Sequence, residues 1–303
     1  MSKSSIKEKP QSNTATSPRD AEEIAKYGYV AGGWVPKLTD WKEAVPNALS
    51  AILVSIFVVV MAVSYIEALP KDRPNPVHQE YYYPKIALFI LGYYLFLAGS
   101  RWYESDSHVL YEMLWACNMG MVFSVVGMLT NSPLLSGLST ALVALDQLLW
   151  YFDMIGFLLK GCKKFPIGVA GYLLWPSTGR MKKITAFHHL WFLPLLLYTL
   201  NWEFPQYAFP MAVFASLILS VTARIHTPFH CLLPKEPGAT EHKVLYLNIN
   251  FAYAFWKDIK VPFLHWFDHK PVALYLPYIV ITANAVLNYP TFLLLTGLLK
   301  LVR

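Results

Sequence analysis

The chain has 303 residues, of which 55% are hydrophobic and only 15% are charged. Water-soluble domains carry about 25% charged residues, so this composition excludes an ordinary soluble domain. The net charge is +6, but the basic residues lie between apolar runs, which indicates membrane topology and gives no pattern for binding nucleic acid. The three separated cysteines, Cys117, Cys162 and Cys231, predict neither a disulfide framework nor a CxxC metal site.

The N-terminal segment differs from the rest of the chain. Residues 1–30 are rich in Ser, Lys, Glu and Pro and too poor in apolar residues to form a core, which predicts a disordered cytoplasmic tail. Residues 31–44 are aromatic and amphipathic, so we expect them to lie at the membrane interface. The membrane domain is therefore placed at residues 45–303.

Seven apolar segments follow, each near the roughly 20 residues that cross about 30 Å of hydrocarbon. They predict an all-α fold, a polytopic transmembrane helix bundle of about seven spans. The expected spans are Val45–Ala68, Pro84–Ser100, His108–Leu129, Pro133–Leu159, Ile184–Leu200, Tyr207–Ala223 and Pro271–Leu299.

The distribution of Lys and Arg predicts the orientation of these spans. Basic residues gather in the N-terminal tail, in the 160–183 loop and after the sixth span, whereas the 130–132 and 201–206 turns have none. Since cytoplasmic loops are enriched in Lys and Arg, we expect a cytoplasmic N-terminus.

Residues 225–270 form a long inner segment that is aromatic but interrupted by prolines. We expect a re-entrant or interfacial loop rather than a span. The chain shows no internal repeat, so an inverted-repeat transporter fold has no support.

Ionisable residues inside the expected spans are the main functional signal, because each costs roughly 2.5–3.5 kcal/mol to insert. The predicted topology places four of them in one layer near the cytoplasmic side: Glu112, Asp153, His188 and His189. The other polar candidates in or beside the membrane are Asn118, Asp146, Gln147, Arg224, Asn248 and Asn250.

Two interpretations of this layer remain open. In the first, a cavity contains Glu112, Asp153 and His189 as catalytic residues, and a divalent metal such as zinc is bound by ligands from the set His188, His189, Asp153, His226 and His230. In the second, the same groups only join helices, for example through Arg224 with Asp153, or Glu112 with a protonated histidine.

Five short motifs occur in order between residues 110 and 295: Glu112–Asn118, Leu149–Asp153, His188–Leu197, Asn248–Asn250 and Tyr289–Thr291. In these motifs the chain resembles an uncharacterised family of bacterial-type multi-pass membrane proteins. The resemblance implies a shared fold and brings no known activity.

Three functions are compatible with the sequence. The favoured one is a membrane-embedded enzyme, metal-dependent in one version, that acts on a membrane lipid or a lipophilic small molecule. The alternatives are a transporter or proton-coupled carrier that uses the carboxylates as a relay, and a structural or interaction subunit of a membrane complex.

Overall fold

The computed structural model describes residues 38–69, 81–161, 163–176, 178–235, 238–255, 262–268 and 270–302. The predicted disordered tail at 1–30, residues 31–37 of the predicted interfacial segment, and Cys162 lie outside the described residues. The described part is mostly helical, as predicted, with three short strands in addition.

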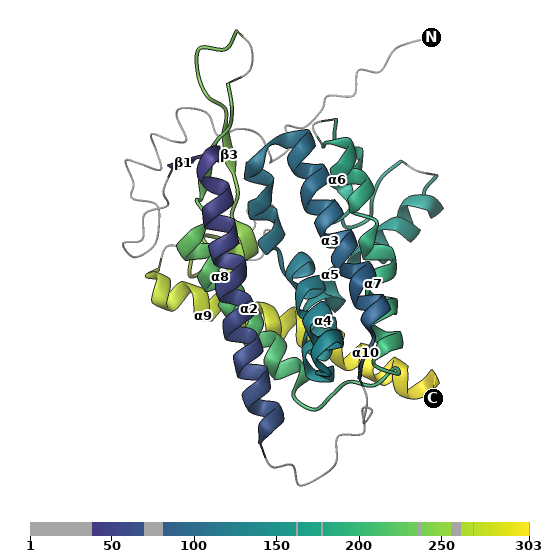
Figure 1. Ribbon diagram of the computed structural model, residues 1–303. Helices are drawn as coiled ribbons and strands as arrows, with labels where there is room; N and C mark the ends of the chain where they lie inside the picture. Colours follow the sequence, from purple (N-terminus) through teal and green to yellow (C-terminus); the bar gives the residue numbers. More distant parts are fainter. Residues whose placement is uncertain are drawn as a thin grey trace.

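Five helical segments are long and apolar enough to cross a membrane, and each coincides with an expected span. Prolines begin α3 and α5, where the missing N–H of proline costs nothing. The segments are α2 (Ala44–Ala68, after a 3₁₀ turn at Trp41–Glu43), α3 (Pro84–Ser105), α5 (Pro133–Leu159), α8 (Ala208–His226) and the final α9–α10 (Figure 1).

The third expected span is bent. A 3₁₀ helix, Ser107–Leu114, joins α4 (Ala116–Thr130) at an angle of 71°, and the pair would count as a sixth candidate span. Trp115 between them has an extended backbone (φ −54°, ψ 140°). The Asn118 side chain stabilises the bend, because its Nδ2 donates to the Glu112 carbonyl at 2.7 Å.

The fifth expected span is not one continuous helix. It consists of α6 (Arg180–Thr185) and α7 (His188–Thr199), which are separated at Ala186 and Phe187. A 12-residue helix such as α7 is about 18 Å long, less than the hydrocarbon thickness. The structure therefore gives five or six candidate spans and does not confirm seven.

α6 and α7 nevertheless run antiparallel to α3 along its length. Near one end of α3, the Arg101 Nε donates to the Thr185 Oγ1 at 2.8 Å. In the middle, the Tyr93 ring packs edge-on to Trp191, with centroids 5.0 Å apart. Just before the other end, the hydroxyls of Tyr81 and Thr199 are hydrogen-bonded at 3.0 Å.

The last segment contains a π-helical turn. α9 (Val272–Ala283) continues through Asn284–Asn288 into α10 (Tyr289–Val302). The Asn284 Nδ2 donates to the Ser216 hydroxyl at 2.9 Å and so joins the turn to α8. A π turn often marks a functional position, but here its polar groups bond to one another and to α8.

Two strands of the inner loop between α8 and α9 form a small sheet with a strand that precedes α2, and the all-α prediction missed this sheet. Strand β2 (His230–Leu232) pairs in parallel with β1 (Leu38–Asp40) and antiparallel with β3 (Val244–Tyr246). Two 3₁₀ turns follow, Ile249–Phe251 and Pro262–His265. The sheet brings part of the predicted interfacial segment against the loop.

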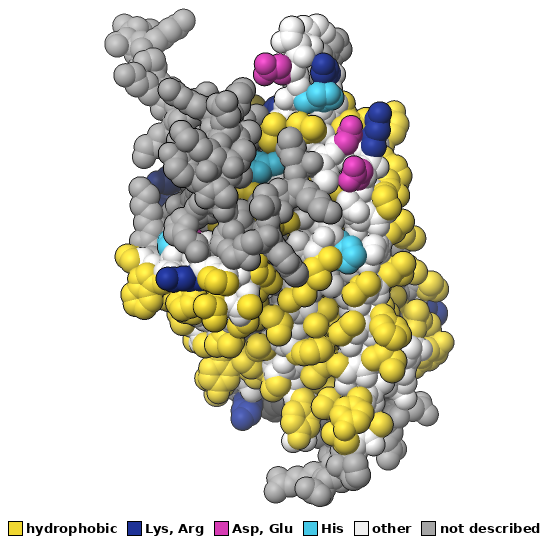
Figure 2. All heavy atoms as spheres, turned by 90° about the vertical axis from the view of Figure 1, so that its left-hand side faces the viewer, with side chains coloured by type: hydrophobic (Ala, Val, Ile, Leu, Met, Phe, Trp, Pro, Cys, Tyr) yellow, Lys and Arg dark blue, Asp and Glu magenta, His cyan; other side chains and the backbone are white. Residues whose placement is uncertain are grey.

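Hydrophobic side chains dominate the outer surface of the helices. Leu53 and Phe57 on α2 are each 66% exposed, which is the expected arrangement for helices that face lipid. Figure 2 shows hydrophobic side chains as a broad belt on one face of the molecule, with the visible acidic side chains beyond one edge of the belt. This surface fits a membrane protein.

Candidate metal site

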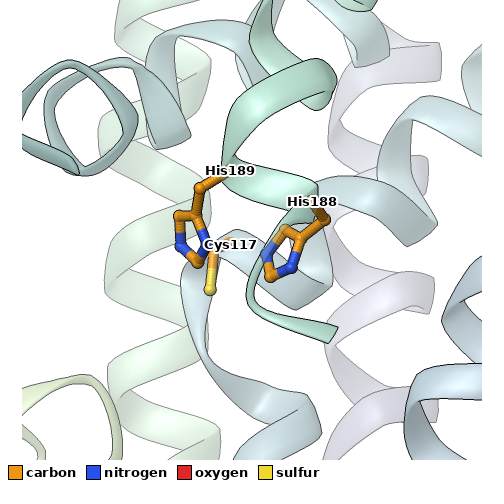
Figure 3. Close-up of side chains that lie close together, drawn as sticks. All are labelled: Cys117, His188 and His189. Carbon is orange, nitrogen blue, oxygen red and sulfur yellow. The ribbon is translucent and has the colours of Figure 1, made fainter. Parts of the chain in front are cut away.

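One cysteine and two histidines meet inside the helix bundle. One ligand atom from each of Cys117, His188 and His189 lies within 4.8 Å of the other two (Figure 3), and no other such trio of Cys, His, Asp or Glu occurs in the part of the chain that is described. Cys117 is half-buried, and His188 and His189 are 1% and 8% exposed.

The two helix breaks bring these residues together. Cys117 is the second residue of α4, directly after the bend at Trp115, and the histidines are the first two residues of α7. The first turn of a helix has free N–H groups and a partial positive charge, which favours an anionic group such as a thiolate. The breaks therefore place the thiol at the N-terminus of one helix and the two imidazoles at the N-terminus of another.

His188 presents an unused nitrogen to the cluster. Its Nδ1 lies 2.6 Å from the Thr185 carbonyl, which only accepts, so this nitrogen carries the proton and Nε2 has a lone pair. That Nε2 is buried and has no hydrogen-bond partner among the described residues. A buried polar atom without a partner costs about 1–3 kcal/mol, and the lone pair of this nitrogen is free to accept a ligand.

His189 is held on three sides. Its Nδ1 lies 2.8 Å from the Ala186 carbonyl and its Nε2 lies 3.0 Å from an Asp146 carboxylate oxygen. Its ring stacks on Trp150 of α5, with centroids 5.8 Å apart and planes 16° apart. The ring orientation is therefore fixed by α5 and by the turn before α7.

Glu112 lies in an ion-pair network rather than in the Cys–His cluster. Its carboxylate lies 3.1 Å from Arg101 Nη1 and 2.6 Å from Lys182 Nζ. Arg101 also bonds Thr185, whose carbonyl accepts from His188 and from the Tyr93 hydroxyl. The partners of Glu112 are thus Arg101 of α3 and Lys182 of α6, and neither is the histidine expected from the sequence.

Asp153, expected as a catalytic or metal-binding group, anchors a loop instead. Its side chain is fully buried and accepts from the backbone N–H groups of Ile167, Gly168 and Ala170 at 2.6–2.9 Å. Gly168 has φ +100°, a conformation that favours glycine and lets its N–H reach the carboxylate. Asp153 does not belong to the Cys–His trio of the described residues.

The remaining candidates serve the loop and the helix contacts. Gln147 is buried and its Oε1 accepts from the Leu193 N–H at 2.8 Å, which joins α5 to α7. Asn248 orders the inner loop, accepting from the Tyr253 N–H at 3.0 Å and donating to the Ala254 carbonyl at 2.7 Å. Asn250 reaches from this loop to the bend before α4.

Arg224, His226 and His230 lie on the inner-loop side and not in the cluster. Arg224 donates to the Ala252 carbonyl at 3.1 Å and lies over the Tyr253 ring, 4.2 Å from its centroid. Burial raises the pKa of the Tyr253 hydroxyl, and this hydroxyl donates to the Thr227 carbonyl. His230 belongs to β2 and packs against Tyr246.

The donor set fits a transition-metal ion. Zinc takes thiolate and imidazole ligands, whereas calcium and magnesium prefer oxygen. The trio offers one sulfur and two nitrogens, and the oxygens of Asp153 and Glu112 already have partners. Of the metal ligands expected from the sequence, His188 and His189 meet here and Asp153, His226 and His230 do not.

Comparison with protein families, with curated proteins and with solved structures gives no match for this chain. The resemblance of residues 110–295 to a bacterial-type family therefore stays a prediction. The site rests on the geometry of its own residues.

Sequence reasoning missed Cys117 as a ligand. The three cysteines are far apart and no spacing motif marks any of them. The available signal was its position in the Glu112–Asn118 motif, between a charged residue and a polar one inside an apolar segment.

Proposed function

We propose that this protein is an integral membrane metalloprotein that holds one divalent ion of the zinc class at Cys117, His188 and His189. The observation that carries the proposal is the buried Nε2 of His188, which has no partner in the described part of the chain and lies beside a thiol and a second imidazole. A metal ion would be the partner for this nitrogen, and the thiolate would neutralise one of its two positive charges.

We further infer seven crossings with a cytoplasmic N-terminus, the third and fifth crossings being broken helices. Support comes from the course of residues 180–199 along α3 and from the basic residues of the 160–183 loop. Irregular backbone at membrane depth is tolerated where it is buried in protein, often at a functional site. Both breaks adjoin the proposed metal site.

The proposed activity is metal-assisted chemistry on a lipophilic substrate. Three protein ligands leave the fourth position of a tetrahedral ion for water or substrate, as in catalytic zinc sites. A metal ion lowers the pKa of bound water enough to make a nucleophile near neutral pH. Since apolar helices surround the cluster, the substrate would be a membrane lipid or a lipophilic small molecule that enters from the bilayer.

The carboxylates favour the enzyme over a proton-coupled carrier. A relay needs carboxylates that exchange protons, but Glu112 is paired with two cations and Asp153 with three backbone N–H groups. Asp146 contacts one of the histidines of the cluster, with its carboxylate 3.0 Å from the His189 Nε2.

Metal analysis of the purified protein tests the proposal. Wild type and the control Cys231→Ser should each bind about one zinc ion per chain, whereas Cys117→Ser and His188→Ala should retain a small fraction of it. Cobalt should give a thiolate charge-transfer absorption that Cys117→Ser lacks. A wild-type protein that takes up neither zinc nor cobalt would reject the metal site.

The catalytic part of the proposal has its own test. The zinc-loaded and the chelated protein are incubated with a membrane lipid extract, and the lipids are compared by mass spectrometry. A product formed only by the zinc-loaded wild type, and absent with His188→Ala, supports an enzyme. Stable metal binding without conversion of any lipid would indicate a structural metal.

A further inference from the structure

His188 and His189 are neighbours on a helix, and this makes their convergence unusual. Consecutive helical residues point about 100° apart, so their side chains do not normally face one site. Here the two rings lie with centroids 4.1 Å apart and planes 37° apart. Figure 3 shows the Cys117 sulfur close to both rings.

The two rings are held by different atoms. His188 uses Nδ1 to bond the Thr185 carbonyl, which leaves Nε2 for a ligand. His189 has a carbonyl 2.8 Å from Nδ1 and the Asp146 carboxylate 3.0 Å from Nε2. A metal ion can take only one nitrogen of His189, so one of these two contacts must yield.

The contact with Ala186 is the one that yields more easily. The Ala186 carbonyl also accepts from the His189 backbone N–H at 3.1 Å, so it keeps a partner when the ring leaves. A hydrogen bond to a carboxylate is roughly twice as strong as one to a neutral carbonyl. Nε2–H therefore stays on Asp146, whereas Nδ1 loses to solvent the proton that it donates to the Ala186 carbonyl, and its lone pair becomes the one that binds the metal.

Resting on the proposed metal site, we infer that His188 binds the ion through Nε2 and His189 through Nδ1, and that Asp146 is the positioning residue that selects Nδ1. Metal-binding histidines commonly donate their other N–H to a carboxylate, which fixes the tautomer and the ring. The use of opposite nitrogens is what lets two adjacent histidines reach one ion.

Asp146 is suited to this role and not to direct coordination. It falls outside the group whose ligand atoms lie within 4.8 Å of one another. Its side chain is 43% exposed, against 10% for that of His189, so it approaches the ring from the more open side of the site. Trp150, one turn further along α5, stacks on the same ring and limits its rotation.

The experiment compares zinc affinity and histidine protonation in detergent-solubilised full-length protein. Asp146→Leu should bind zinc about 10- to 100-fold more weakly than wild type, with the cobalt–thiolate absorption still present. Asp146→Asn should lose less, because its amide oxygen still accepts from Nε2–H. Asp106→Asn, which changes an exposed carboxylate after α3, is the matched control and should bind like wild type.

Nitrogen NMR of isotope-labelled histidine in the zinc-loaded protein gives the second readout. We expect the ring proton of His188 on Nδ1 and that of His189 on Nε2. The His189 signals are assigned as those that disappear from the spectrum of His189→Ala. Unchanged affinity in Asp146→Leu, or a His189 proton on Nδ1, would overturn the inference. Complete loss of zinc in Asp146→Leu would overturn it too, since Asp146 would then be a ligand. Failure of the wild type to bind metal would instead reject the proposed function.

Discussion

The Oδ1 of Asn250 accepts a hydrogen bond from the backbone N–H of Ala116 at 3.1 Å, although 134 residues separate them. The Nδ2 of the same side chain donates to the Leu114 carbonyl at 2.6 Å. Asn250 thus bonds the backbone carbonyl before Trp115 and the backbone N–H after it. This break lies two residues before Cys117 in the chain. The inner loop thereby stabilises the geometry of the metal site.

Replacing Asn250 with alanine should destabilise the protein by about 2–3 kcal/mol, because a part-buried N–H and a buried C=O both lose their partner. Chemical unfolding in mild detergent, followed by tryptophan fluorescence, measures the change. Asn288→Ala is the control: it removes one partly exposed bond within the last helical segment and should cost less than about 1 kcal/mol. Equal effects of the two substitutions would contradict the proposed role of Asn250.

Asp153→Asn should loosen the loop after α5 without removing metal. The carboxylate accepts hydrogen bonds from backbone N–H groups through both of its oxygens. An amide has a single acceptor oxygen, so the NH₂ group of asparagine would face N–H donors with which it cannot bond. Hydrogen bonds to a charged group contribute about 1.5–3 kcal/mol, so we expect a loss of that order. Faster tryptic cleavage in the 160–164 segment, at unchanged zinc content, is the expected result.

If Asp153→Asn lost zinc while the loop kept its resistance to trypsin, Asp153 would have the metal-binding role expected from the sequence. Asp106→Asn again provides the control for loss of a carboxylate at an exposed position.

Glu112→Gln should destabilise the protein strongly, because Arg101 is 7% exposed and would keep a buried charge without its counter-ion. Breaking a buried pair on one side typically costs about 3–5 kcal/mol. The double substitution Arg101→Met with Glu112→Leu should recover most of the loss. Unfolding free energies of the three proteins check this.

Lys182→Met is the comparison for the exposed half of the same network. The Lys182 side chain is 39% exposed, so its ion pair with Glu112 is screened and should contribute less than about 1 kcal/mol. A catalytic Glu112 would behave differently: its replacement would abolish turnover at unchanged stability.

The two described cysteines should differ in reactivity with a maleimide. Burial raises the pKa of the Cys231 thiol to about 12, so near neutral pH it is uncharged and should remain unlabelled. Its labelling should stay slow at pH values where an ordinary exposed cysteine already reacts, since the thiolate is the nucleophile. Cys117 should be protected by bound zinc and become reactive after chelation.

The experiment uses a Cys162→Ser background, so that Cys117 and Cys231 are the remaining thiols. Mass spectrometry of the peptides then distinguishes labelled Cys117 from labelled Cys231. Labelling of Cys117 at the same rate with and without zinc would argue against thiolate ligation. Labelling of Cys231 in the folded protein near neutral pH would show that its strand opens to solvent.

The amino-acid sequence by itself determined the helical membrane domain. Runs of about 20 apolar residues cannot form a water-facing surface, and five of them became the candidate spans, from α2 to α9–α10. It also marked His188 and His189 as costly polar residues in an apolar segment. The orientation, with Lys and Arg on the cytoplasmic side, stays a prediction from the sequence.

Only the tertiary structure decided which polar groups meet. Depth along a helix placed Glu112, Asp153 and the histidines in one layer, but depth gives no direction around the helix axis. The fold directs Asp153 to Gly168 and Glu112 to Arg101, and the two helix breaks bring Cys117 to the histidines. Such breaks depend on distant partners such as Asn250, so no local pattern of residues could have predicted them.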